Sequence, residues 1–238
     1  LRETMHPKFR ELYIFPGTEL AVNGGTHVIL VFDPLKGSSD VAGIIRTCGY
    51  AGPWGNPAGR ASMSLEQVLA VTQEQKALII PAHVDVPPNG LWQMPDYGSQ
   101  RNALSHRSLF ALERKSKTST PPTAVLGLKK TFAEVLGSDS HKLADVGREF
   151  TWVKMGQPTL EGLRLALLDG NQSFKRSDDF AGDPNEAQAP NAIERFEVEN
   201  AQFIGRAKTF VVEFSPWMNT LIGGRGTGKS SLLEFIRI

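Results

Sequence analysis

Residues 77–85 have the sequence ALIIPAHVD. Its first five residues are a continuous apolar run, and polar groups follow at His83 and Asp85. A short, unbroken apolar run of this kind is typical of a strand buried on both faces of a parallel sheet. The stretch therefore predicts an α/β fold in which polar side chains stand at the ends of buried strands.

Strands and helices alternate on both sides of this run. Strands are predicted in ELYIFPGTEL (11–20), which Pro16-Gly17 interrupts, in THVILVFDP (26–34) and in FAEVLGSDSH (132–141). A helix is predicted over 37–49, capped near Ser39 or Asp40, and another from the capping box of Ser64 and Gln67 to about Ala77. A third helix is predicted over 158–170, with Thr159 as its N-cap and Gly170 as its stop. This alternation favours a barrel of parallel strands.

Composition sets broad limits on the chain. Hydrophobic residues make up 40% and charged residues 21% of the 238 residues, which fits a globular chain able to bury a core. The single cysteine, Cys48, excludes an internal disulfide and a cysteine-based zinc knuckle, and it favours a cytoplasmic location. No apolar run reaches the roughly 18 residues of a membrane span, so no membrane partner is expected. The net charge of +1 argues neither for nor against nucleic acid.

Five polar residues stand at the ends or beginnings of the predicted strands. They are carboxylates and imidazoles, the ligands that suit Mn²⁺, Fe²⁺ or Zn²⁺, and such ions lower the pKa of bound water and clamp a phosphate. The candidate metal ligands are Glu19, His27, His83, Asp139 and His141. For a single histidine such as His27 or His83, a structural role is the competing interpretation.

A cation-rich stretch covers residues 107–130. It carries six cationic residues against one acid, Glu113: Arg107, Arg114, Lys115, Lys117, Lys129 and Lys130. Clustered cations could contact a nucleic-acid backbone. A solvated charged loop is the more common explanation for such a pattern, and both interpretations stay open here.

Residues 171–191 are predicted to be a linker, because they are polar and contain Pro, Gly and Asn. Three strands are then predicted, in IERFEVEN (193–200), KTFVVEFS (208–215) and MNTLIGG (218–224). The last one leads into GGRGTGKSS, residues 223–231, which meets the P-loop pattern G-x-x-x-x-G-K-[ST].

The P-loop pattern predicts a site for ATP with Mg²⁺. Its glycines let backbone N–H groups turn toward phosphate oxygens, and the following helix adds the positive end of its dipole. Lys229 would bind the β- and γ-phosphates, and Ser230 would ligate Mg²⁺. The predicted nucleotide-binding residues are Gly223, Gly224, Arg225, Gly226, Thr227, Gly228, Lys229, Ser230 and Ser231. A chance glycine-rich turn is the alternative.

Two family resemblances rest on these motifs. Residues 192–238 resemble the first strands and Walker A segment of ABC-type ATPases of the structural-maintenance-of-chromosomes kind, with Asn219 at the usual Asn position and Arg225 where many such loops carry Asn. Residues 1–170 resemble the PHP (polymerase and histidinol phosphatase) phosphoesterases, through the GTE of Glu19, the PAH of His83 and the SDSH of residues 138–141. The PHP resemblance implies a (β/α)7 barrel that holds up to three metals.

Together the two parts resemble the TrlF-type proteins, in which a PHP domain is fused to an AAA-like ATPase. The stretch 138–170 carries most of this likeness. The family's opening H-x-H motif is missing, and the Walker B acid would lie after Ile238, so we expect a fragment of a longer protein. The expected fold is α/β: an incomplete PHP-type barrel over 1–170, a linker over 171–191 and the start of a P-loop ATPase domain over 192–238.

The resemblance implies a hydrolase: a metal-dependent phosphoesterase coupled to an ATP-binding module and acting on DNA or another nucleic acid. A dimer through the ATPase head is compatible with it. One alternative is an ATP-driven DNA-binding structural protein whose barrel is a degenerate scaffold. Another is a small-molecule phosphatase regulated by nucleotide. Fold alone does not decide among them.

Overall fold

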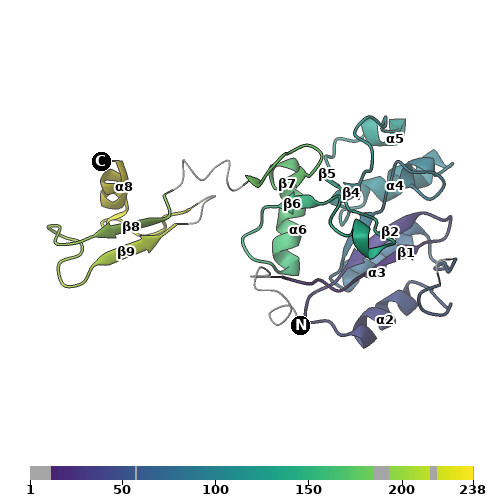
Figure 1. Ribbon diagram of the computed structural model, residues 1–238, viewed down its shortest axis with the longest axis horizontal. Helices are drawn as coiled ribbons and strands as arrows, with labels where there is room; N and C mark the ends of the chain where they lie inside the picture. The colour runs from purple at the N-terminus through teal and green to yellow at the C-terminus, as the bar shows by residue number, and fades with distance from the viewer. Residues whose placement is uncertain (1–11, 57, 185–192, 215–218, 238) are drawn as a thin grey trace. The chain divides into compact units, whose positions relative to one another are not determined.

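The ALIIP run forms strand β3, Leu78–Pro81, and all four of its residues are buried. It lies at one side of a three-stranded sheet with the order β1-β2-β3. The other two strands are β1, Gly17–Ala21, and β2, His27–Val31. The computed structural model (Figure 1) describes residues 12–56, 58–184, 193–214 and 219–237, and contacts divide the chain into two units between Phe180 and Ala181.

The predicted parallel arrangement of these strands is wrong, because β1 pairs antiparallel with β2 and β2 pairs antiparallel with β3. The connection between β1 and β2 explains the first pairing. It is a tight turn in which Val22 N–H donates to Thr26 O at 2.9 Å, and Gly24 and Gly25 take positive φ angles of 95° and 89°. Neighbouring parallel strands need a crossover of about a dozen residues or more, which this turn cannot supply.

The remaining strands of the first unit form shorter ladders. Strand β4, Ala111–Glu113, runs parallel to β5, Ala133–Val135, and β6, Thr151–Val153, runs antiparallel to β7, Phe174–Arg176. A parallel bridge between Ile79 and Leu109 joins β3 to the approach of β4. The α/β class is thus confirmed, but the ladders of the described residues do not close into a barrel.

Among the residues of the first unit that the structure describes, five α-helices surround these strands. They are α2 (Ser38–Thr47), α3 (Leu65–Glu74), α4 (Tyr97–Ser105), α5 (Thr123–Leu126) and α6 (Leu160–Asp169), with short 3₁₀ turns at Leu91–Gln93, Leu143–Asp145 and Gly170–Gln172. The capping box of Ser64 and Gln67 is present, although α3 ends at Glu74 rather than near Ala77. The predicted Thr159 cap and Gly170 stop of α6 are also confirmed.

Helix α2 begins one or two residues before the predicted cap. Its N-cap is Gly37, and Asp40 is the third residue of the helix, where its Oδ2 accepts a hydrogen bond from Gly37 N–H at 3.0 Å. Asp40 therefore caps the helix from inside its first turn, where its negative charge also complements the positive end of the helix dipole.

The sheet carries apolar side chains on both faces, because alternate residues of a strand point to opposite sides. Val28 and Leu30 of β2 belong to the cluster formed with α2, α3, α4 and α5. Ile29 and Val31 belong to a second cluster, together with Leu167 of α6. Helix α6 thus covers the second face of the sheet, where the interior of a closed barrel was expected.

The second unit contains the hairpin of β8, Arg195–Val198, and β9, Phe210–Glu213, followed by α8, Lys229–Arg237. Two of its three predicted strands are therefore present. Residues 219–224 of the third predicted strand are not in a strand, and no ladder in the described part of the chain includes them. The side chains of Leu221 and Ile222 are exposed. Strand β7 lies inside the range 171–191 that was predicted to be a linker.

Candidate metal centre

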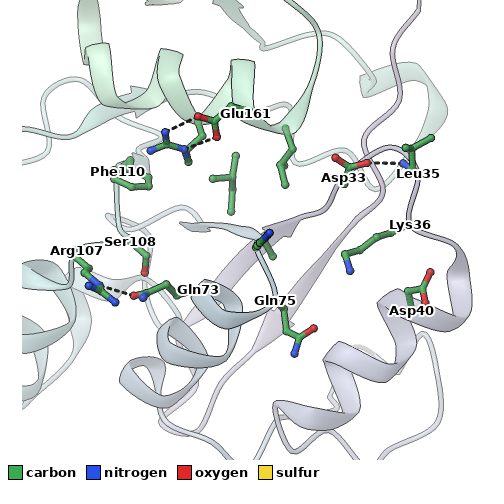
Figure 2. A pocket seen from close by; sticks show the side chains of 15 residues that line it. Asp33, Leu35, Lys36, Asp40, Gln73, Gln75, Arg107, Ser108, Phe110 and Glu161 are labelled. Carbon is green, nitrogen blue, oxygen red and sulfur yellow. Dashed lines mark hydrogen bonds and ion pairs between the residues drawn. The ribbon is translucent and has the colours of Figure 1, made fainter.

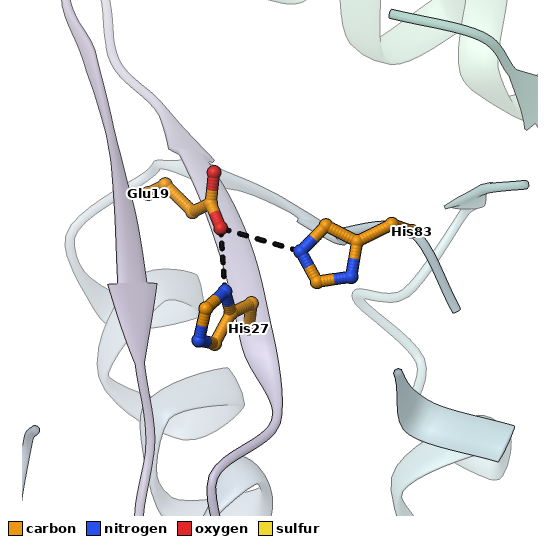
Figure 3. A group of neighbouring side chains, drawn as sticks. All are labelled: Glu19, His27 and His83. Atoms are coloured by element: carbon orange, nitrogen blue, oxygen red, sulfur yellow. Dashed lines mark hydrogen bonds and ion pairs between the residues drawn. The ribbon is translucent and has the colours of Figure 1, made fainter. Parts of the chain in front are cut away.

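Three of the five predicted metal ligands come together (Figure 3). Glu19 Oε1 lies 2.6 Å from Nδ1 of His27 and 3.4 Å from Nε2 of His83. One ligand atom from each of the three residues lies within 4.8 Å of the other two. The side chain of His83 is 12% exposed and that of Glu19 is 43% exposed, so the cluster is open to solvent on the carboxylate side.

The hairpin register explains the Glu19–His27 contact. Ala21 pairs with His27 and Glu19 pairs with Ile29, so Glu19 and His27 are diagonal neighbours on one face of the sheet. Neither residue stands at the carboxyl end of a parallel strand, as the barrel hypothesis required. The antiparallel pairing brings them together instead.

His83 reaches the cluster by leaving the strand geometry. Continued alternation from Ile80 would turn residue 83 to the opposite face from Ile80. The backbone of His83 has a φ of 32°, in the left-handed region that non-glycine residues rarely adopt. Such a conformation costs about 1–3 kcal/mol and persists where the surroundings impose it. Here Glu113 Oε2 accepts the His83 N–H at 2.9 Å.

Electrostatics couple the three residues. Hydrogen bonding from His83 lowers the pKa of Glu19 against the opposing effect of burial, and His27 lowers it further. Hydrogen bonding to Glu19 raises the pKa of His83, again against burial. The ionised carboxylate of Glu19 and the protonated imidazole of His83 thus stabilise each other. A divalent cation would take the place of that proton.

The donor set fits a divalent transition metal. Two imidazoles and one carboxylate suit Zn²⁺, Mn²⁺ or Fe²⁺, and three protein ligands leave room for water or substrate. The Nδ1 atom of His83 is buried and has no hydrogen-bond partner within the described residues. This nitrogen is on the side of the ring away from Glu19, so the ring atom available to a metal is Nε2.

Asp139 and His141 are not part of this cluster. Both follow β5, and Asp139 takes a left-handed φ of 48°. His141 Nδ1 lies 3.0 Å from the carbonyl oxygen of Asp139, so the SDSH segment is folded on itself. Asp139 nevertheless has an electrostatic effect on Glu113. Burial is the main cause of the raised pKa of Glu113, and the charge of Asp139 raises that pKa further.

Glu113 is a residue that the sequence analysis passed over. It ends β4, is 4% exposed, and connects two neighbouring segments. One carboxylate oxygen binds the His83 backbone, and the other faces Gly137, where an added Cβ would lie 2.7 Å from it. The sequence FALE, residues 110–113, does resemble the other apolar runs that end in a polar residue, but it was hidden among the cations around it.

Most cations of the stretch 107–130 are engaged within the protein. Lys115 donates to Gly137 O at 2.5 Å and lies 3.6 Å from Glu149. Arg114 pairs with Glu134 at 3.0 Å, and Lys130 donates to His106 O at 2.6 Å. These contacts favour a structural role for the stretch over a free phosphate-binding surface.

A hollow lies at the end of the sheet opposite the metal cluster (Figure 2). It has a volume of about 790 Å³, and its lining includes Asp33, just after β2, and Leu78, the first residue of β3. His27 and His83 lie at the opposite ends of these strands, so the hollow and the metal cluster are separate. Arg164 in its wall is held by both carboxylate oxygens of Glu161, at 2.6 and 2.7 Å. This hollow contains no cluster of metal ligands among the described residues.

In the second unit, residues 223–228 of the predicted nucleotide-binding site form a loop, and Lys229, Ser230 and Ser231 begin α8. Gly226 and Gly228 take positive φ angles of 82° and 86°. The Lys229 ammonium donates to the carbonyl oxygens of Gly223 and Gly224 at 2.5 and 2.6 Å. Residues 226–231 line a hollow together with Phe203, Lys208 and Phe210. None of the described helices is long and apolar enough to cross a membrane.

No protein-family model matches the chain, and no curated protein matches it. Two endonuclease structures are among the solved structures that are similar to this chain. The first is the novel lesion-specific endonuclease PfuEndoQ from Pyrococcus furiosus, 20% identical with a TM-score of 0.51, over 67% of this chain and 40% of that one. The second is Endonuclease Q in complex with a 27-mer duplex substrate that has an abasic lesion at the active site. It is 19% identical with a TM-score of 0.50, over 63% of this chain and 38% of that one.

The chain thus spans about 40% of the length of these endonucleases. At this level of identity the similarity shows a related fold. The residues that the structure describes show neither a closed barrel nor an ATPase head.

Proposed function

We propose, from the fold that this chain shares with lesion-specific endonucleases, that it belongs to a metal-dependent hydrolase of phosphodiester bonds in DNA. The observation that carries the proposal is the cluster of Glu19, His27 and His83 on one side of the sheet. The PHP resemblance of the sequence leads to the same chemistry independently of the fold comparison.

The three side chains have distinct tasks in this proposal. A bound Zn²⁺, Mn²⁺ or Fe²⁺ would supply a Lewis acid and an acidified water for attack on phosphorus. Glu19 supplies the negative charge of the site, and the hydrogen bonds of the two histidines keep it ionised. His27 and His83 supply nitrogen ligands through Nδ1 and Nε2, the ring atoms that face Glu19. The open carboxylate side leaves space for a phosphate group.

Asp139 and His141 are proposed to complete the site. Their segment follows β5, which is the parallel neighbour of β4, and Asp139 influences the β4 carboxylate Glu113 through its charge. Since Glu113 also binds the backbone of His83, the two candidate ligand groups are linked through one side chain. The complete set proposed is Glu19, His27, His83, Asp139 and His141.

Cleavage assays with the 238-residue chain test the proposal. A labelled duplex with an abasic lesion and an undamaged duplex are incubated with Mn²⁺ or Zn²⁺. Wild type should cleave the DNA, and His83→Ala should abolish cleavage. His106→Ala is the matched control, because His106 contacts Ser108 rather than the cluster. Turnover of phosphomonoesters alone would favour the small-molecule phosphatase, and the absence of any metal-dependent hydrolysis would favour the degenerate scaffold.

A second proposed activity is ATP binding with Mg²⁺ at residues 223–231, coupled to the hydrolase. It is supported by the two left-handed glycines and by the start of α8 at Lys229. The Lys229 ammonium donates to the carbonyl oxygens of Gly223 and Gly224, and a bound phosphate would attract the ammonium away from them. Lys229→Ala should abolish binding of a fluorescent ATP analogue, whereas Arg237→Ala, at the far end of the same helix, should retain it. Equal binding by both variants would refute this site.

A further inference from the structure

One tryptophan of the first unit has an exposed side chain. Trp54 lies in the loop after α2 and is 54% exposed. It lines a hollow of about 250 Å³ whose wall also contains Glu19, a residue of the cluster. This volume is below the roughly 300–1,000 Å³ of sites for drug-sized ligands, so it suits a single planar group.

A second hollow adjoins the first. The two share Thr18, Ile45 and Trp54 in their walls, and the second extends to Lys36. Trp54 therefore belongs to the walls of both hollows, one of which also contains Glu19 and the other Lys36. A nucleotide placed here would have its base at an aromatic ring and a cation near its phosphate.

The tryptophan is held in place by its neighbours. Arg46 lies over the Trp54 ring at 4.3 Å and donates to the carbonyl oxygens of Tyr50 and Gly52 at 2.9 and 3.3 Å. The ring of Tyr50 stacks near that of Trp54, with centroids 5.7 Å apart and planes 28° apart. The Tyr50 hydroxyl donates to Pro53 O at 2.6 Å, just before the tryptophan.

The loop is also fitted closely around Tyr50. A Cβ added to Gly59 would lie 2.5 Å from the Tyr50 hydroxyl oxygen, and one added to Gly52 would lie 3.0 Å from it. The aromatic surface of Trp54 is thus fixed before any ligand binds, which reduces the entropy lost on binding. An exposed ring held in this way is not needed to fill the core.

We infer that Trp54, held by Arg46 and Tyr50, is a stacking platform for an unpaired base of the DNA on which the metal cluster would act. The inference rests on the proposed function. Aromatic side chains bind single-stranded nucleic acid by stacking, which is tolerant of sequence because every base has a flat face. The platform thereby selects DNA in which a base has left the duplex.

Binding measurements without metal separate this platform from catalysis. Anisotropy of a labelled single-stranded oligonucleotide is measured in EDTA with wild type, Trp54→Ala, Trp54→Phe and Tyr97→Ala. Tyr97 is the matched control, since it is 50% exposed on α4 and lines neither hollow. Stacking is worth about 1–3 kcal/mol per base, so Trp54→Ala should bind about 5- to 150-fold more weakly. Trp54→Phe should retain most of the affinity, and Tyr97→Ala should match wild type.

An oligonucleotide that is abasic at every position provides the decisive comparison, because it keeps the phosphates and lacks the bases. Wild type and Trp54→Ala should bind it equally. If Trp54→Ala binds the base-containing strand as tightly as wild type does, the platform is refuted, and His83-dependent cleavage would still support the proposed function. If wild type neither binds nor cleaves DNA, the proposed function fails and the platform fails with it.

Discussion

The backbone N–H of His83 donates to Oε2 of Glu113 at 2.9 Å, across two strand ends that are 30 residues apart in the sequence. This bond holds a histidine ligand in a left-handed conformation. The buried carboxylate of Glu113, which ends β4, therefore helps to position His83.

Removing the Glu113 carboxylate should weaken metal binding without removing a ligand. In Glu113→Ala the His83 N–H loses its hydrogen-bond acceptor, and the strained backbone of His83 loses the bond that supports it. Groups that orient metal ligands typically contribute 10- to 100-fold in affinity, so a loss of roughly that size is expected in a Zn²⁺ titration. Glu113→Gln retains an acceptor oxygen and should lose much less. Equal affinities for Glu113→Ala and wild type would show that Glu113 does not position His83.

Gly137→Ala should act on the same carboxylate from the other side. The new methyl group would lie 2.7 Å from Glu113 Oε1, so the carboxylate has to move. We expect a loss of stability of about 1–3 kcal/mol by urea unfolding, together with weaker Zn²⁺ binding. Gly156→Ala is the control, because its added Cβ meets nothing within 4 Å. Identical behaviour of the two variants would contradict the close contact.

Metal affinity should depend on pH through His83. The hydrogen bond to Glu19 raises the pKa of His83, so its proton competes with the metal at higher pH than that of a free histidine. Affinity should therefore fall as the pH is lowered through this raised pKa. Glu19 adds no such competition near neutral pH, since its own pKa is lowered. Zn²⁺ or Mn²⁺ titrations between about pH 6 and pH 8 measure the effect, and an affinity that stays constant would speak against it.

The Ser64 cap should contribute to stability independently of the site. Ser64 Oγ accepts from Gln67 N–H, and Gln67 Oε1 accepts from Ser64 N–H at 2.9 Å. Ser64→Ala should cost about 1 kcal/mol in the free energy of unfolding. Ser39→Ala is the matched control, because α2 does not use Ser39 as its cap. If both changes cost the same, the capping box would not be the source of the stability.

The local signals in the sequence predicted local structure well. The Ser64 and Thr159 caps, the Gly170 stop and the buried run of β3 all depend on neighbouring residues, and all are found. Strand direction depends on how strands pair, and the alternation of elements wrongly suggested parallel neighbours. Strand β4 was missed because its three residues are too short for a periodic pattern and lie among cations.

The site was predictable in part for a similar reason. Glu19, His27 and His83 could be named by residue type and place in apolar runs, and the structure brings them together. Their actual geometry depends on a diagonal hairpin register and on the left-handed backbone of His83, which no spacing rule shows. Trp54 gave no signal, because exposure of an aromatic ring in a loop is a property of the folded chain.

A crystal of the full chain soaked in Zn²⁺ shows through the anomalous signal of the metal whether Glu19, His27 and His83 bind it. We expect a peak about 2.0–2.2 Å from a carboxylate oxygen of Glu19 and from one ring nitrogen each of His27 and His83, and no such peak in His83→Ala. A peak at other residues, or an occupied site that survives His83→Ala unchanged, would contradict this expectation.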